Sequence, residues 1–223
     1  MRIPLTRYGL REIVLGSLLC LAAGIVCAWV LWPQALVPAG AWVFLLSFFR
    51  DPERPCRAGP GELLSPADGT VADIVEVDAP VFLEGRALRI GVFMSVFSCH
   101  VNRAPAGGTV EMVQHFPGKY FDARDERSMT ENEHNFIGLR MPDGRKVLVN
   151  QIAGLVARRI VCAVSPGDAL AQGERFGMIK FGSRLELFVP LSDGPEARVE
   201  VGEKVKAGRD VLVAYADRPP AAV

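Results

Sequence analysis

The pattern of apolar and polar positions divides the chain into an apolar N-terminal part and a longer part of short alternating segments. No residue from Ile13 to Trp32 is charged, and this run is apolar apart from two glycines and a serine. It has about the length that a helix needs to cross a bilayer. A second uncharged stretch, Ala35–Phe49, is short for a span, so a tilted or re-entrant segment stays open. Prolines at 33 and 38 indicate a turn between the two apolar stretches. The pattern therefore predicts a hydrophobic helical hairpin within residues 1–50.

From about Asp51 onward, short segments separated by turn residues predict β-structure. Gly-containing turns such as Ala67–Gly69 and Pro142–Gly144 mark the boundaries. Strands at this spacing indicate a sandwich or a barrel-like fold, and the polar segment Lys119–Asn132 is expected to be a surface loop. The predicted strands are Val71–Val77, Arg86–Phe93, Thr109–Gln114, Asn135–Leu139, Lys146–Gln151, Val156–Val164, Met178–Val189 and Val211–Tyr215.

The segment Phe176–Pro190 is predicted to be a strand that carries a serine on its apolar face. Its odd positions from Ile179 to Val189 are apolar except for Ser183, so the hydroxyl is expected on the buried face. Gly182 comes directly before it and gives the backbone a freedom that other residues lack. A buried hydroxyl beside a flexible carbonyl suits attack of the chain on itself. The alternative is a core serine bonded to backbone, with the glycine marking a bulge.

Composition and charge limit the partners and the compartment. The formal net charge is zero, which gives no electrostatic argument for nucleic-acid binding. The five cysteines form no CxxC pair and no metal-finger spacing, in agreement with a reducing compartment and with the expectation of no metal site. Arginines lie on both sides of the apolar part, at 2, 7 and 11 and at 50, 54 and 57. A hairpin leaves both basic flanks in the cytoplasm, so we expect a cell-membrane protein whose domain after the hairpin lies on the cytoplasmic side.

An internal echo indicates the architecture of the β part. Gly167–Phe176 and Gly202–Val211 share one pattern of glycine, acid, aliphatic residue, glycine and apolar residue. With Ser65–Val71 upstream, these turns resemble the flattened β-barrel of lipoyl and biotinyl carrier domains. No lysine here matches the exposed hairpin-tip lysine of a carrier, so the resemblance supports the architecture rather than a carrier role. The expected fold is mainly β, with a barrel-sandwich domain over 51–223 and a membrane-anchoring helical hairpin over 1–50.

Three motifs carry the candidate chemistry, and they occur in the order Ser65–Thr70, Phe93–Pro105 and Phe181–Arg184. Each has an ordinary alternative. Asp68 in the first motif suits a tight turn, and His100 in the second suits a satisfied core histidine. Together, in this order, with a hydrophobic N-terminus and a barrel-like repeat, the motifs resemble the phosphatidylserine decarboxylase family in its short prokaryotic form.

The resemblance implies a proenzyme that cuts itself between Gly182 and Ser183. Its products are a large chain 1–182 and a small chain 183–223, which stay paired as a heterodimer, with further oligomerisation left open. Ser183 becomes a covalent pyruvoyl group, and neither a metal nor pyridoxal phosphate is needed. The family forms a Schiff base between this ketone and phosphatidylserine, and the group serves as the electron sink for loss of CO2 to give phosphatidylethanolamine.

The resemblance also assigns roles to other residues. Asp68 matches the family's acidic residue in self-cleavage, and His100 matches its histidine in decarboxylation. Arg103 stands where longer members carry the second histidine of an Asp-His-Ser triad, so either His100 serves both steps or His134 contributes. His134 is itself a departure, since the family often has arginine there. The candidate contacts for the lipid phosphate are Lys119, Arg103 and Arg184.

Two rival functions stay open on the sequence. A non-enzymatic membrane-anchored lipoyl-like barrel, acting as a carrier or an adaptor, predicts an intact chain and an ordinary Ser183. A decarboxylase of another serine-headed lipid, such as archaetidylserine, predicts the same cut, because the chemistry takes place at the head group.

Overall fold

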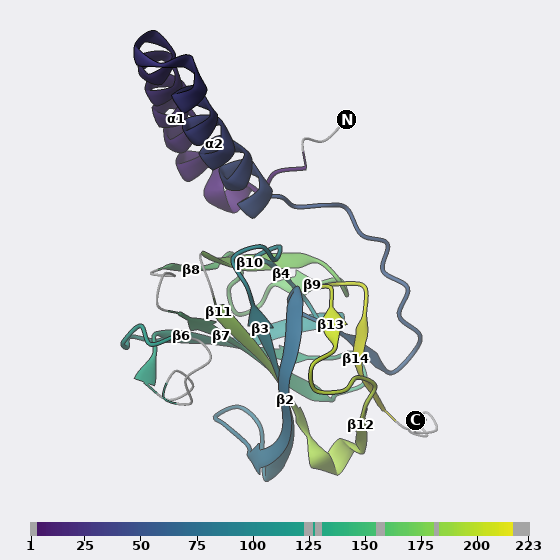
Figure 1. Cartoon of the computed structure of the whole chain (residues 1–223). Coiled ribbons are helices and arrows are strands. Elements are labelled where there is room, and N and C mark those ends of the chain that lie inside the picture. The colour runs from purple at the N-terminus through teal and green to yellow at the C-terminus, as the bar shows by residue number, and fades with distance from the viewer. Residues whose placement is uncertain (1–3, 123–126, 128–130, 155–158, 181–182, 216–223) are drawn as a thin grey trace. The chain divides into compact units, whose positions relative to one another are not determined.

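A computed structural model describes residues 4–122, 127, 131–154, 159–180 and 183–215. The chain forms two compact units, Met1–Glu53 and Arg54–Val223, which we call the hairpin unit and the β unit (Figure 1). Each is described by itself below.

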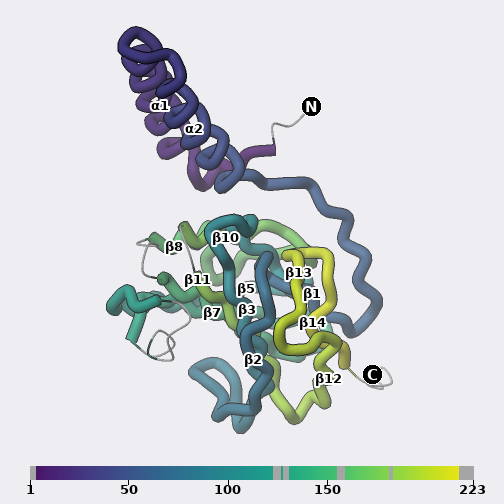
Figure 2. The backbone as a smooth tube through the Cα atoms, in the orientation of Figure 1, coloured from purple at the N-terminus to yellow at the C-terminus, as the bar shows by residue number. Residues whose placement is uncertain are grey.

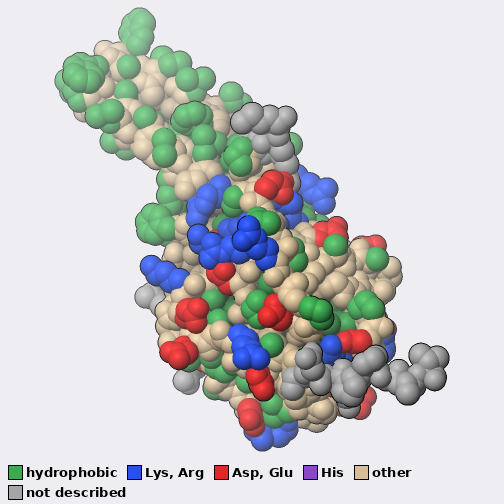
Figure 3. All heavy atoms as spheres, turned by 90° about the vertical axis from the view of Figure 1, so that its right-hand side faces the viewer, with side chains coloured by type: hydrophobic (Ala, Val, Ile, Leu, Met, Phe, Trp, Pro, Cys, Tyr) green, Lys and Arg blue, Asp and Glu red, His purple; other side chains and the backbone are tan. Residues whose placement is uncertain are grey.

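The hairpin unit contains two apolar helices that pack side by side. Helix α1 (Leu10–Val30) follows the short 3-10 helix η1 (Arg7–Gly9), and η2 (Trp32–Ala35) leads into α2 (Leu36–Phe48). The segment Arg7–Val30 is long and apolar enough to cross a membrane, and α2 with η2 forms a shorter apolar helix. Hydrophobic side chains cover its surface (Figure 3), which is the surface expected of helices that face lipid.

Among the described residues, the strands of the β unit form one large sheet and two small ones, and all pairs are antiparallel. The large sheet contains, in spatial order, β13 (Lys204–Val205), β2 (Gly69–Asp78), β3 (Arg86–Met94), β11 (Ser183–Pro190), β7 (Lys146–Ala153), β6 (His134–Arg140), β5 (Gly108–Phe116) and β9 (Ala169–Leu170). The small sheets are β1 (Glu62–Leu64), β14 (Val211–Tyr215) and β12 (Pro195–Ala197), and β4 (Val101–Arg103), β10 (Arg175–Lys180) and β8 (Arg159–Cys162). The 3-10 helix η3 (Leu191–Asp193) follows β11.

The large sheet curls around the main hydrophobic core of the β unit (Figure 2). Strand β11 lies at its centre, between β3 and β7, and all eight of its residues are buried. Alternate residues of this strand, Leu185, Leu187 and Val189, lie in the core cluster. The expectation of a mainly β domain behind an apolar helical segment is confirmed.

Most predicted strands match observed ones, but the described parts of Met178–Val189 belong to two sheets. Strand β10 ends at Lys180 and β11 begins at Ser183, and they lie in different sheets. The two residues between them, Phe181 and Gly182, lie outside the described residues. The alternation of apolar residues did not indicate this change of sheet, in which β10 pairs with β4 and β8 while β11 pairs with β3 and β7.

Five short strands, β1, β4, β9, β12 and β13, were not predicted, because two or three residues carry no readable alternation. The predicted strand Val156–Val164 corresponds to β8, and its first three residues lie outside the described residues.

The echo in the sequence corresponds to a structural repeat. The turn Ser65–Val71 leads into β2 as Ala104–Val110 leads into β5, and the sequences SPADGTV and APAGGTV differ at two positions. The two echo segments then supply β13, which pairs with the start of β2, and β9, which pairs with the start of β5. Asp68 occupies the position that Gly107 has in the other half. The turn therefore forms in one half without an acid, which indicates a further role for Asp68.

Candidate active site

Ser183 is the first residue of β11, in the middle of the large sheet. It pairs with Met94 at the end of β3 on one side and with Ala153 at the end of β7 on the other. Its side chain is fully buried, as predicted from the alternation. Among the described residues, the partner of its hydroxyl is the sulfur of Met94, at 3.3 Å. A thioether is a weak acceptor, so this serine is not the core serine bonded to backbone that was the alternative reading.

His100 lies in the loop between β3 and β4 and is also fully buried. Its Nδ1 is 2.9 Å from the carbonyl oxygen of Ser98. Since a carbonyl oxygen can only accept, Nδ1 carries a hydrogen, and in the neutral form of the ring Nε2 then carries the lone pair. The backbone oxygen of His100 accepts the N–H of Ile179 in β10, at 3.3 Å, which fixes the loop to the strand that precedes Ser183. The ring is therefore held in the tautomer that can act as a base through Nε2.

A buried amide network connects the His100 segment with the face of the sheet that carries Ser183. Asn102, two residues after His100, accepts a 2.8 Å hydrogen bond at Oδ1 from Nε2 of Gln151 in β7. Gln151 pairs with Leu185, two residues beyond Ser183 in β11, and residues two apart in a strand share a face. The side chain of Asn102 thus reaches the core face of β7 within one pleat of the position opposite Ser183.

Asp68 lies at the same end of the large sheet, directly before β2. One strand, β3, lies between β2 and β11, so at about 4.8 Å between neighbouring strands Asp68 is roughly 10 Å across the sheet from the row of Ser183. Its carboxylate pairs with both terminal nitrogens of Arg54 and accepts the backbone N–H of Ala207, at 2.8 Å. The partner of Asp68 is therefore a guanidinium and not an imidazole.

Arg54 is a site residue that the sequence reasoning used only as a membrane flank. Its Nη1 also donates to the carbonyl oxygen of Ala207, at 2.7 Å. Burial lowers the pKa of the Arg54 guanidinium, but the Asp68 carboxylate outweighs this and, with smaller effects of Cys99 and Asp210, raises it. Asp68 and Arg54 thus form a largely buried pair that is fixed to the backbone at Ala207. No sequence motif signals this pairing, because Arg54 and Asp68 belong to segments without a shared pattern.

His134 lies at the same end of the sheet but on the other face. It pairs with Ile152, which pairs with Arg184, whereas Ser183 belongs to the next cross-strand row. Since neighbouring residues of a strand point to opposite faces, the structure does not bring His134 to Ser183. Its ring stacks on Phe116, with centroids 4.7 Å apart. His115 is half-exposed and lies 3.9 Å from Glu133.

The basic residues considered for the lipid phosphate have different surroundings. Arg103 is buried and donates to the carbonyl oxygen of Gly173, at 3.1 Å. Arg184 is buried and paired with Asp73 and Glu186. The structure therefore does not favour these two as phosphate contacts. Lys119 is exposed and pairs with Glu131, at 2.7 Å.

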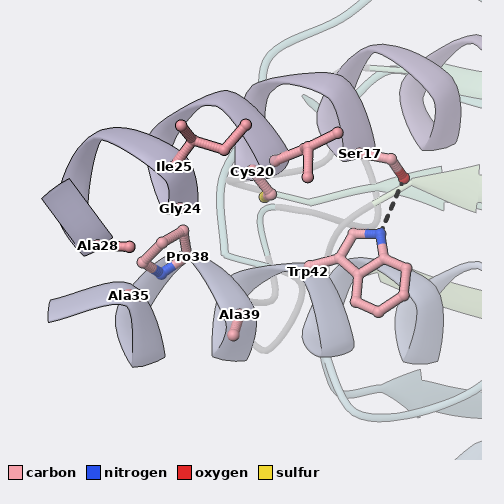
Figure 4. A pocket seen from close by; sticks show the side chains of 10 residues that line it. Ser17, Cys20, Gly24, Ile25, Ala28, Ala35, Pro38, Ala39 and Trp42 are labelled. Atoms are coloured by element: carbon pink, nitrogen blue, oxygen red, sulfur yellow. Dashed lines mark hydrogen bonds between the residues drawn. The ribbon is translucent and has the colours of Figure 1, made fainter. Parts of the chain in front are cut away.

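The hairpin unit contains a cleft without catalytic groups. It lies between α1 and α2, has a volume of about 500 Å³, and is lined almost entirely by apolar side chains (Figure 4). Its polar contact is a 3.0 Å hydrogen bond from Nε1 of Trp42 to Oγ of Ser17. The candidate chemistry therefore belongs to the β unit.

Comparison with known proteins shows the family of the chain. The sequence matches the family described as phosphatidylserine decarboxylase over residues 42–213. The chain belongs to this family. The match includes the Asp68 turn, the His100 loop and the start of β11, which are the three segments that meet at one end of the large sheet.

Individual relatives cover most of both chains. Proteins named phosphatidylserine decarboxylase proenzyme from Ralstonia nicotianae, Rhodopirellula baltica and Ruegeria pomeroyi are 46%, 42% and 48% identical to this chain. The alignments cover 86%, 96% and 79% of this chain and 84%, 89% and 81% of the relatives. The alignment with the Rhodopirellula baltica protein, at 96% of this chain, takes in most of both units.

Proposed function

We propose that this chain is the proenzyme of a phosphatidylserine decarboxylase that cuts itself between Gly182 and Ser183. The observation that carries the proposal is Ser183 itself, a fully buried serine at the start of a central strand whose hydroxyl has a thioether as its partner. Such a hydroxyl is not held by a strong acceptor and is available for reaction.

The self-cleavage follows from the chemistry of serine. The Oγ of Ser183 attacks the carbonyl carbon of Gly182, an O–C bond forms, and the peptide C–N bond breaks to give an ester and a free amine. Loss of the Cα proton then breaks the Cβ–Oγ bond, which leaves a carboxylate on Gly182 and dehydroalanine at 183. Tautomerisation and hydrolysis consume one water and release ammonia. The complete change adds one water and removes one ammonia.

The pyruvoyl group formed in this way supplies an electron sink for loss of CO2 from an amine-bearing carboxylate. The surroundings of residue 183 fit this group. Its methyl group needs no hydrogen-bond acceptor, and the sulfur of Met94 is an apolar neighbour for it. Complete burial at 183 also excludes water from the reacting atoms.

His100 is the histidine that this arrangement favours for proton transfer. Of the histidines at 100, 115 and 134, it is the one linked through Asn102 and Gln151 to the face of Ser183. Its Nε2 lone pair can accept a proton during self-cleavage and return one during decarboxylation. We therefore assign both steps to His100 and none to His134.

The small chain is expected to stay bound after the cut. Strand β11 is inserted between β3 and β7 of 1–182, while β13 pairs with β2 and β14 pairs with β1. Separating them requires the loss of these ladders and of the shared core. We propose that the product is a heterodimer anchored to the cell membrane by the hairpin, with the β unit in the cytoplasm.

Asp68→Asn is expected to slow self-cleavage about tenfold. The amide keeps the shape of the side chain but loses the charge that pairs with Arg54, and a hydrogen bond to a charged group contributes about 1.5–3 kcal/mol. The Arg54 side chain then loses the charged partner that holds it at this end of the large sheet, and the turn before β2 is less firmly fixed. The measurement is the time course of full-length chain against fragments after synthesis in vitro.

The matched control is Asp143→Asn, which removes a carboxylate paired with Arg145 in the turn between β6 and β7. It should be processed like the wild type. An unchanged rate in Asp68→Asn would reduce Asp68 to a turn residue.

The activity itself is tested with the purified full chain in detergent–lipid micelles. Phosphatidylserine should be converted to phosphatidylethanolamine with release of CO2. Conversion of archaetidylserine but not phosphatidylserine would assign the alternative lipid. An intact chain without activity toward either lipid would favour the non-enzymatic barrel.

A further inference from the structure

Four charged side chains form a closed ring on the face of the large sheet opposite the Ser183 hydroxyl. Arg184 pairs with Asp73 and, through Nε at 3.0 Å, with Glu186. Arg89 pairs with the same two carboxylates, at 3.2 Å to Asp73 and 3.7 Å to Glu186. Positive and negative groups alternate around the ring, and the formal charges sum to zero. We call these four residues the charge ring.

The charge ring is set into the sheet. The side chains of Arg184 and Glu186 are 5% and 2% exposed, against 17% for Arg89 and 24% for Asp73. Its members come from β2, β3 and β11, and Asn150 of β7 donates to Glu186 at 3.1 Å. Burial lowers the pKa of Arg184, but Glu186 and then Asp73 outweigh it, so the pKa is raised and the guanidinium is charged. Because removing a charge from water costs free energy, buried charged side chains persist only where they are paired.

The backbone around the ring is shaped to admit Arg184. Gly91 of β3 pairs with both Glu186 and Asp73, and a Cβ on it would lie 2.0 Å from Nη2 of Arg184. Glycine in a central strand is otherwise unfavourable and marks a close approach. A bulge in β2 between Val71 and Asp73 also alters the register directly before Asp73. The glycine at 91 and the bulge before Asp73 thus both lie next to the guanidinium of Arg184.

We propose that Arg184 is a positioning residue that holds the new N-terminus of the small chain in register after self-cleavage. This inference rests on the proposed cut before Ser183. The cut removes the covalent link to β10 and turns a central strand into a strand that begins at the reactive residue. Chain ends fray unless they are tied down. Arg184, the residue next to the cut, is bound on both sides within the charge ring. Residue 183 therefore stays between Met94 and Ala153, with its reacting group turned into the core.

Two variants of the full-length chain test this role. Arg184→Lys keeps the charge but loses the planar fork that binds two carboxylates at once. Gly91→Ala keeps all four charges and instead places a methyl group where the guanidinium lies. The control is Arg140→Lys, which alters an exposed pair with Glu111 between β5 and β6. Intact mass gives the cut fraction of each protein, and all rates are expressed per cut chain.

Both variants should lower kcat on phosphatidylserine micelles about ten- to a hundredfold, because residue 183 is displaced from its reactive position. KM should change little, because the binding of the lipid is not affected. They should also react faster with hydroxylamine in the absence of lipid, since the ketone at 183 becomes accessible. A merely structural role would lower the unfolding temperature without this kcat–KM split. Arg140→Lys should match the wild type in both measurements.

Wild-type kcat and wild-type hydroxylamine reactivity in both variants would overturn the role of Arg184 while leaving the proposed function intact. If Arg184→Lys does not fold, Gly91→Ala alone decides between these results. A wild-type chain that is never cut would instead overturn the proposed function, and the positioning role with it.

Discussion

Ser183→Ala is expected to leave one uncut chain with no detectable decarboxylase activity. The hydroxyl at 183 is both the nucleophile of the cut and the source of the reactive ketone, so its removal abolishes both steps. The fold should survive, because alanine fills the same buried position beside Met94 with the loss of a single oxygen. Denaturing gel electrophoresis measures the cut, and release of CO2 from carboxyl-labelled phosphatidylserine measures the activity.

Ser192→Ala is the matched control for this variant. It removes a hydroxyl just beyond the other end of β11, in η3, and should be cut and active like the wild type. Normal processing of Ser183→Ala would show that another residue supplies the nucleophile and would refute the site.

His100→Ala is expected to lower decarboxylation per cut chain about 10²- to 10⁴-fold, which is the range that a positioned acid or base contributes. It should also slow the cut, since Arg103, at the family's second histidine position, is held by Gly173 and is not a base at neutral pH. The measurements are the rate of fragment formation and the kcat of the fraction that is cut.

His134→Ala serves as the comparison for His100→Ala. It removes a ring on the opposite face of the sheet, stacked on Phe116, and should leave both rates near the wild-type values. Cleavage of His100→Ala at the wild-type rate would confine His100 to the lipid step. A large loss in His134→Ala would contradict the placement of the site on the core face.

The sequence permitted the correct prediction of features that depend on local pattern. The apolar hairpin, the place of most long strands and the burial of Ser183 all follow from periodicity that a single segment carries. The echo between Gly167–Phe176 and Gly202–Val211 likewise predicted a repeat, and these segments occupy matching places beside β5 and β2.

Features that depend on pairing between distant segments could not be predicted in this way. Arg184 and Glu186 alternate with apolar residues and are typical of a solvated face, yet both are buried because Asp73 and Arg89 compensate their charges from two other strands. Likewise, the division of Met178–Val189 between two sheets depends on which neighbours each described part pairs with. Neither relationship leaves a local signal.

Intact mass spectrometry of the purified wild-type protein under denaturing conditions tests the central claim most directly. We predict two masses that correspond to 1–182 and 183–223. Their sum should equal the full-length mass plus one water minus one ammonia. Borohydride should add two hydrogens to the smaller chain alone, because only that chain carries a ketone. A single mass equal to the full 24.2 kDa chain, unchanged by borohydride, would contradict the account.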